Sequence, residues 1–139
     1  MMTEKEQCDK LLDSILSVAK NLLCKNKEFY PIGMVMNSNE EMEITAFQNE
    51  ETDHPDSNDV INTLVDIHSS LAKNGKIMVS AIAFDTKCNI KGKSGDAILV
   101  SVEHKNKTSQ TYFLTYKKGL FNKISFGEML SLEGKHNIF

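Results

Sequence analysis

The stretch Ala97-Ile98-Leu99-Val100-Ser101-Val102-Glu103-His104 decides the fold. Its first four residues are apolar on both sides of an extended chain, which is typical of a strand in the middle of a sheet. We expect one face to carry Ile98, Val100 and Val102 and the other to carry Ala97, Leu99 and Ser101. The strand predicted at 77–85 precedes it by a turn too short for a crossover helix, so the two should pair antiparallel.

Other strands are predicted on both sides of this pair. Residues 30–36 and 42–47 flank a connection rich in turn-forming residues, and 110–117 follows the central pair. Residues 123–132 are a strand, or a strand plus a turn, because Gly127 interrupts them. Pro31 cannot donate to a ladder, which predicts that 30–36 lies at an edge of the sheet.

Two helices complete the pattern. Apolar residues recur at helical spacing over 3–26, where Thr3 and Glu6 have the form of a capping box. The second helix is predicted over 57–74, with Asp56 or Ser57 as its cap and Gly75 at its end. We expect both helices to bury apolar residues on the same face of the sheet, namely Leu12, Ile15, Leu22, Ile61, Leu64 and Leu71.

The order α-β-β-α-β-β-β, with or without a last strand, predicts one α+β domain over residues 1–139. Its core would be an antiparallel sheet of five to six strands with two helices packed on one face. Profilin-, longin- and roadblock-like domains share this order, but an analogy of fold carries no function by itself.

The composition of the chain limits the classes of partner that we expect. The chain has 139 residues, a net charge of −3, sixteen lysines and no arginine. Arginine supplies most bidentate recognition of guanine and phosphate, so we expect no nucleic-acid partner. Three cysteines lack zinc spacing, the first residues lack the pattern of a signal peptide, and the apolar runs are short. These features predict a cytoplasmic protein with no membrane partner, in which Cys8 and Cys24 lie on or beside the apolar stripe of the first helix.

Acidic and basic groups gather around the turn predicted at 86–95. Lys87, Lys91 and Lys93 could attract an anion there, with Asp85 and Asp96 orienting them. We name Asp85, Lys93 and Asp96 as candidate ligand-binding residues, with a small hydrolase as one version of this hypothesis. The alternative, which we favour, is that the lysines only keep a long turn solvated.

No other motif predicts chemistry. Gly92-Lys93-Ser94 lacks the earlier glycine and the following helix of a phosphate-binding loop. The acidic residues within 50–56 lack calcium-loop spacing, and carboxylates before a helix also favour its dipole. His68, on the apolar stripe of the second helix, is interpreted as a core histidine. We therefore expect no catalytic residue, no metal site and no cofactor.

Several phrases resemble one family when they are taken together. They are Phe29-Tyr30-Pro31-Ile32-Gly33, Gly75-Lys76-Ile77, Ala81-Ile82-Ala83-Phe84-Asp85, Asp96-Ala97-Ile98-Leu99-Val100, Glu103-His104 and Tyr116-Lys117-Lys118. The set is similar to a family of short, uncharacterised bacterial proteins of about this length. The resemblance implies a bacterial, cytosolic, single-domain protein, and it transfers no activity.

The sequence therefore favours a non-catalytic binding or protein-interaction module. The strand at 30–36, if it is an edge, could pair with a second copy or with another protein. Met34, Met36 and Met42 could give that strand pair an adaptable apolar surface, although filling the core is their more common use.

Overall fold

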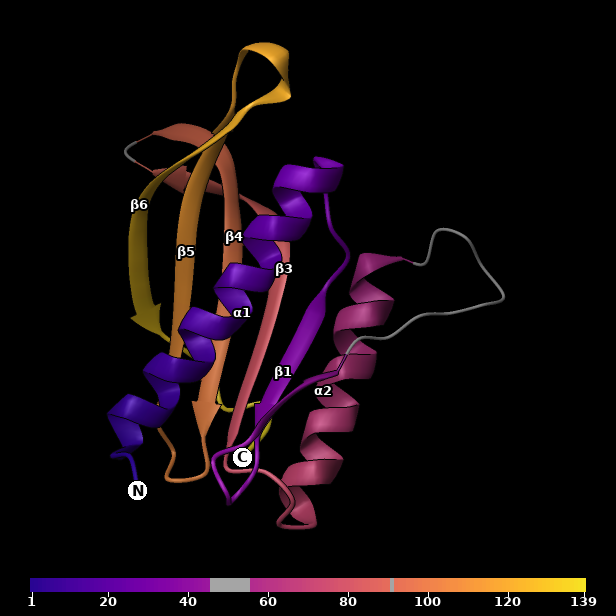
Figure 1. The fold of residues 1–139 in the computed structure, drawn as a ribbon, viewed down its shortest axis with the longest axis vertical. Coiled ribbons are helices and arrows are strands. Elements are labelled where there is room, and N and C mark those ends of the chain that lie inside the picture. The colour runs from indigo at the N-terminus through magenta and orange to yellow at the C-terminus, as the bar shows by residue number, and fades with distance from the viewer. Residues whose placement is uncertain (46–55, 91) are drawn as a thin grey trace.

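Six antiparallel strands form one open sheet in the order β2-β1-β3-β4-β5-β6 within the residues that the structure describes (Figure 1). The structure is a computed structural model, and it describes residues 1–45, 56–90 and 92–139. The elements are α1 (Glu4–Asn26), β1 (Ile32–Met36), β2 (Met42–Thr45), α2 (Ser57–Lys73), β3 (Val79–Ile90), β4 (Lys93–His104), β5 (Ser109–Lys118), the short 3-10 helix η1 (Leu120–Asn122) and β6 (Ile124–Glu133). The α+β class and the element order are as predicted, and the last strand is present.

The central pair is β3 and β4. They are antiparallel, with Ala83 opposite Val100 and Ala81 opposite Val102. Ile98, Val100 and Val102 point to the face that α1 covers, where they join its apolar core. The predicted alternation along β4 is therefore confirmed, and Ile98 is completely buried.

The last strand contains a register shift. β5 and β6 pair from Gln110 opposite Glu133 to Lys118 opposite Ile124, with an irregularity between Leu114 and Tyr116. Gly127 lies at this bulge, and a Cβ atom there would come within 2.6 Å of the Thr115 hydroxyl. The glycine that made the strand uncertain is therefore what lets the extra residue fit.

The prediction that residues 30–36 form an edge is wrong. β1 pairs with β2 on one side and with β3 on the other, and all five of its residues are buried. Pro31 precedes the first ladder residue, Ile32, so its missing N–H removes no bond of the strand. The described edges of the sheet are instead β2 and β6.

The long turn expected at 86–95 is also replaced by strand. β3 and β4 stay paired as far as Ile90 opposite Lys93, so a two-stranded ribbon takes up most of that segment. Gly92 has a φ of +80°, a left-handed conformation that glycine adopts without strain. The pairing of β3 and β4 therefore extends further than the sequence suggested.

Helix α1 covers the centre of one face, as Figure 1 shows. The capping box of Thr3 and Glu6 is present, and Leu11, Ile15 and Leu23 are fully buried. Small residues Ala81 and Ala83 lie beneath the helix in the same core, which lets its backbone approach the sheet. Of the α1 residues expected in the core, Leu12 and Ile15 are buried and Leu22 is partly buried.

Helix α2 differs from the expectation because it packs on the opposite face. Its buried residues Val60 and Leu64 contact Ile82, which alternates away from the α1 core. Its His68 lies against Gly33, where a Cβ atom would come within 2.7 Å of the imidazole Nε2. Asp56 caps the helix through the Asn58 N–H, as predicted, while Ile61 and Leu71 are only partly buried.

The two faces are covered unequally. α1 spans β1, β3 and β4, whereas α2 lies mainly against β1 and β3, and its His68 also reaches Thr45 of β2. The outer half of the α2 face, over β4 to β6, is therefore left without a helix. In the described part of the chain, neither helix is long and apolar enough to cross a membrane.

Candidate functional site

Asp85 and Asp96 lie together on one side of the β3–β4 ribbon. Asp96 forms an ion pair with Lys87, its partner across the ladder. Tyr116, on β5, donates its hydroxyl proton to Asp85 over 2.6 Å. Burial, and then the Asp85 carboxylate, raise the pKa of Tyr116, so the phenol remains a donor. These carboxylates already hold partners from the chain itself.

Lys93 does not join this cluster. It lies at the end of the ribbon opposite Ile90, three residues from Asp96, so its side chain alternates to the other side of the strand. Of the three residues named from the sequence, Asp85 and Asp96 lie on one side of the ribbon, while Lys93 and Asp96 both line a separate cavity of about 440 Å³ beside β5 and β6. The lysine that reaches the pair is Lys87, and it is exposed and paired with Asp96.

Asp85 also lines a cavity of about 630 Å³ between the end of α1, residues 28–32 and the start of α2. The only formally charged side chains among its described lining residues are Glu28 and Asp85. Two carboxylates give this cavity the wrong field for an anion. The cavity therefore does not support the anionic ligand considered from the sequence.

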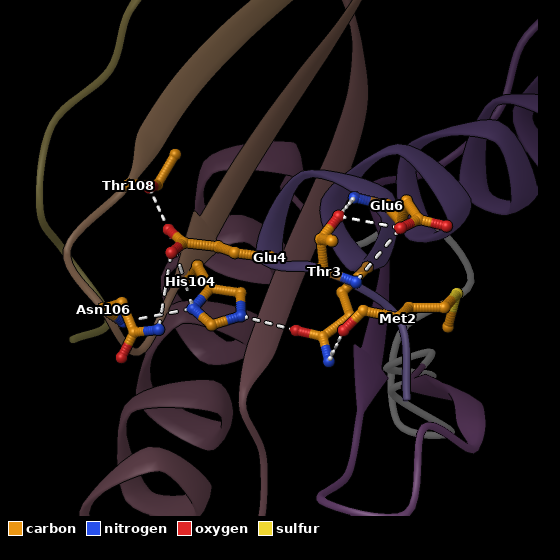
Figure 2. Close-up of polar contacts among 8 residues, drawn as sticks. Met2, Thr3, Glu4, Glu6, His104, Asn106 and Thr108 are labelled. Atoms are coloured by element: carbon orange, nitrogen blue, oxygen red, sulfur yellow. Dashed lines mark hydrogen bonds and ion pairs between the residues drawn. The ribbon is translucent and has the colours of Figure 1, made fainter.

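A polar network surrounds His104, at the opposite end of the sheet (Figure 2). His104 Nδ1 accepts the Asn106 N–H at 3.1 Å, which leaves Nε2 to donate to the Gln7 side chain at 2.8 Å. Glu4 accepts hydrogen bonds from Asn106 and Thr108. Burial lowers the pKa of His104. This network joins the start of α1 to the β4–β5 turn, and its described contacts leave no ring nitrogen for a substrate.

His68 is a core histidine, as predicted. It is fully buried, with Nδ1 2.7 Å from the Ser80 hydroxyl and Nε2 2.6 Å from the Thr45 hydroxyl. A serine beside an imidazole invites comparison with a nucleophile and its base, but the second nitrogen faces a hydroxyl instead of a carboxylate. Ser80 is itself buried, and burial lowers the pKa of His68 to about 4. Through these two hydrogen bonds, His68 joins α2 to Ser80 of β3 and to Thr45 of β2.

No group of three His, Cys, Asp or Glu residues is placed to hold a metal ion within the described ranges. The acidic residues at 50–55 lie outside those ranges. Cys8 is buried as expected, whereas Cys24 is exposed and Cys88 is intermediate. Burial, followed by the charges of Glu4 and Asp9, raises the pKa of Cys8 to about 11.

The thiols should therefore differ in reactivity. We expect a disulfide reagent at pH 8 to modify Cys24 quickly and Cys8 only slowly, because the thiolate attacks and Cys8 is both buried and protonated. Timed quenching followed by peptide mass spectrometry measures both rates. Equal rates in the folded protein would contradict the burial of Cys8, and urea should remove the difference.

The β5–β6 hairpin carries an exposed apolar tip. Figure 1 shows it projecting beyond the end of the sheet. Leu120 is 85% exposed and Phe121 is 99% exposed. Phe121 and Asn122 have φ angles of 61° and 59°, a left-handed conformation that is uncommon for a bulky residue. An aromatic ring held in strained backbone and in water is a feature of binding sites.

The edge strand β6 extends this apolar surface. It is ten residues long, contains no proline and no lysine, and exposes Met129 and Leu132. Natural edge strands are usually shortened or protected by charges, and β6 has only Glu128 and Glu133. Four of the eight large hydrophobic residues that are exposed in the described chain belong to this hairpin. The hairpin is the best candidate for a functional surface.

Sequence reasoning missed this surface. No candidate residue was named between the strands predicted at 110–117 and 123–132, where lysine, glycine and asparagine surround the tip. The available signal was the apolar pair Leu120-Phe121 inside that polar segment. The comparisons add nothing to it: no family model, no curated protein and no solved structure matches the chain.

Proposed function

We propose that this chain is a non-catalytic protein-interaction module that pairs with a second copy of itself through β6. The observation that carries the proposal is the long edge strand without a described partner on its outer side. A cytoplasmic location belongs to the same proposal, supported by three free thiols, one of them exposed.

Backbone groups of β6 are available for this pairing. Gly134 donates its N–H to Ser109, which places that residue among the ones whose backbone faces β5. Residues facing the neighbouring strand alternate along an antiparallel ladder, so Met129 and Ser131 direct their N–H and C=O groups to the open edge. A partner strand would satisfy these groups by continuing the sheet.

Apolar burial adds to the hydrogen bonds. Antiparallel pairing of two β6 strands places the hairpin tip of one copy beside the far end of β6 in the other. Removing Leu120 and Phe121 from water would contribute about 1.5–3 kcal/mol for each side chain. Both are almost fully exposed in the single chain, so folding leaves this stabilisation for a partner.

Ser131→Pro should abolish dimerisation while the chain stays folded. Proline removes one outward N–H at an exposed position, and it breaks no bond of the β5–β6 ladder. Ser131→Thr is the matched control, because it keeps the N–H and favours a strand. Light scattering after size exclusion, up to about 1 mM chain, should show dimers for the wild type and Ser131→Thr and monomers for Ser131→Pro.

The hairpin tip provides an independent arm of this experiment. Phe121→Ser should weaken the dimer about tenfold without changing the thermal transition of the fold, because the ring is exposed in the monomer. A wild-type chain that stays monomeric, or a dimer unaffected by Ser131→Pro, would overturn the proposal.

A further inference from the structure

The face that α2 leaves partly uncovered contains a second surface feature. A groove of about 420 Å³ runs between α2 and the end of β6. Ile82 and Phe84 of β3, Leu99 of β4 and Phe113 of β5 line it from the sheet, and Ile61 and Val65 line it from α2. The segment 134–139, which follows β6, crosses one end of this groove toward α2.

Glu103 lies where the segment crosses. Its carboxylate is on the central strand β4 and is 2% exposed. Each carboxylate oxygen accepts one backbone N–H at 3.2 Å, one from Asn137 and one from Ile138. A buried carboxylate without donors would be costly, so this position requires a peptide backbone that presents two consecutive N–H groups.

One apolar side chain completes the recognition. Ile138 packs partly buried against the cluster of Val60, Leu64 and Ile82. Hydroxyl groups fix the peptide direction on both sides, since Ser69 donates to the Asn137 carbonyl and Ser109 donates to the Lys135 carbonyl. The groups recognised on the segment are one aliphatic side chain, two backbone N–H groups and two backbone carbonyls. Peptide-binding sites combine main-chain hydrogen bonds with side-chain pockets in this way, and the pockets provide the specificity.

Segment 134–139 is only weakly bound to the rest of the fold. Lys135, His136 and Asn137 are exposed, and Ile138 is only partly buried. Few buried apolar contacts and exposed hydrogen bonds are the conditions under which a segment opens locally. The groove also continues beyond the segment, which leaves room for a longer occupant.

We infer that the groove around Glu103 is a peptide-binding site, and that segment 134–139 occupies it in cis. Its ligand class is an extended peptide with two consecutive free N–H groups, the second belonging to an aliphatic residue that enters the α2 cluster. The segment acts as an internal competitor, so an incoming peptide must displace it. This site shares no hydrogen bond with the outer edge of β6 and does not depend on dimerisation.

The test uses the full chain and a fluorescent peptide with the sequence of residues 134–139. Ile138→Asp should release the segment and increase peptide affinity at least tenfold over the wild type, measured by anisotropy. His136→Asp is the matched control, because it places the same carboxylate on an exposed residue of the same segment and should behave as wild type. Glu103→Gln combined with Ile138→Asp should lose binding, since an amide NH₂ would replace one acceptor oxygen.

Equal peptide affinity for all variants, or no binding to folded Ile138→Asp up to millimolar peptide, would overturn the inference. If Ile138→Asp does not fold, the wild-type chain provides the test instead. Millimolar unlabelled peptide should then shift the backbone amide resonances of Asn137 and Ile138 toward their unstructured positions. Unchanged resonances would overturn the inference equally. Ser131→Pro should bind peptide as the wild type does, which separates this result from the dimer.

Discussion

Replacing Ile98 by alanine should lower the free energy of unfolding by about 4 kcal/mol. The side chain is 0% exposed at the middle of the α1 core, and rigid neighbours on β3 and β5 prevent that core from closing around the space. Both the lost transfer energy and the cavity then count against the fold. Urea unfolding followed by circular dichroism gives the value.

The adjacent residue is the matched control. Leu99 has the same number of carbon atoms but points to the other face, where it is half-buried and lines the groove beside α2. Leu99→Ala should therefore cost only about 1–2 kcal/mol, since part of the side chain already contacts water. Equal losses for the two variants would mean that the described difference between the faces is incorrect.

As the pH is lowered, the fold should begin to lose stability at a pH higher than the range in which most carboxylates titrate. The folded pKa of His68 is about 4, below the unfolded value of 6.5, because burial disfavours the imidazolium. Between these two pKa values, His68 is therefore protonated in the unfolded chain and neutral in the folded chain. The stability contributed by neutral His68 is complete well above pH 6.5 and falls as the pH drops toward 4.

The expected loss from His68 is about 2 kcal/mol between pH 8 and pH 5. His104 acts in the same direction, because burial lowers its pKa too. Urea unfolding at several pH values should show this slope, and His68→Gln should remove the part due to His68. A nuclear magnetic resonance titration that places the pKa of His68 above 6 would contradict the prediction.

Local signals in the sequence predicted the elements well, because their causes are local. The capping box of Thr3 and Glu6 and the cap at Asp56 depend on residues only a few positions apart. The alternation along β4 depends on the strand itself. These features are present where the sequence placed them.

That the two helices pack on opposite faces of the sheet is indicated in the sequence by the strand at residues 32–36. All five residues from Ile32 to Met36 are buried, although only every second one can face α1. Such a run indicates a strand covered on both faces, the same argument that identified residues 97–100 as central. Pro31 suggested an edge instead, and that inference failed because its position lies just before the ladder.

The candidate site was less predictable for a different reason. Asp85, Lys93 and Asp96 are close in sequence, but a side chain's direction along a strand depends on register, which the expected turn did not provide. Glu103 meets its partners through a segment more than thirty residues later in the chain. Nothing in the local sequence of either segment indicates that contact.

The bulge at Gly127 changes which alternate residues of β6 face the α1 side of the sheet. On the α1 side, Ile124 and Phe126 come before the shift and Met129 comes after it, so even-numbered positions give way to odd-numbered ones. The shift brings Phe126 within 6.5 Å of the Tyr116 ring and beneath Lys20. A strand without the extra residue would turn Phe126 to the opposite face. One glycine thus decides which side of the molecule each half of this strand presents, and the insertion or deletion of a single residue beside it would exchange inside for outside along one half of the strand.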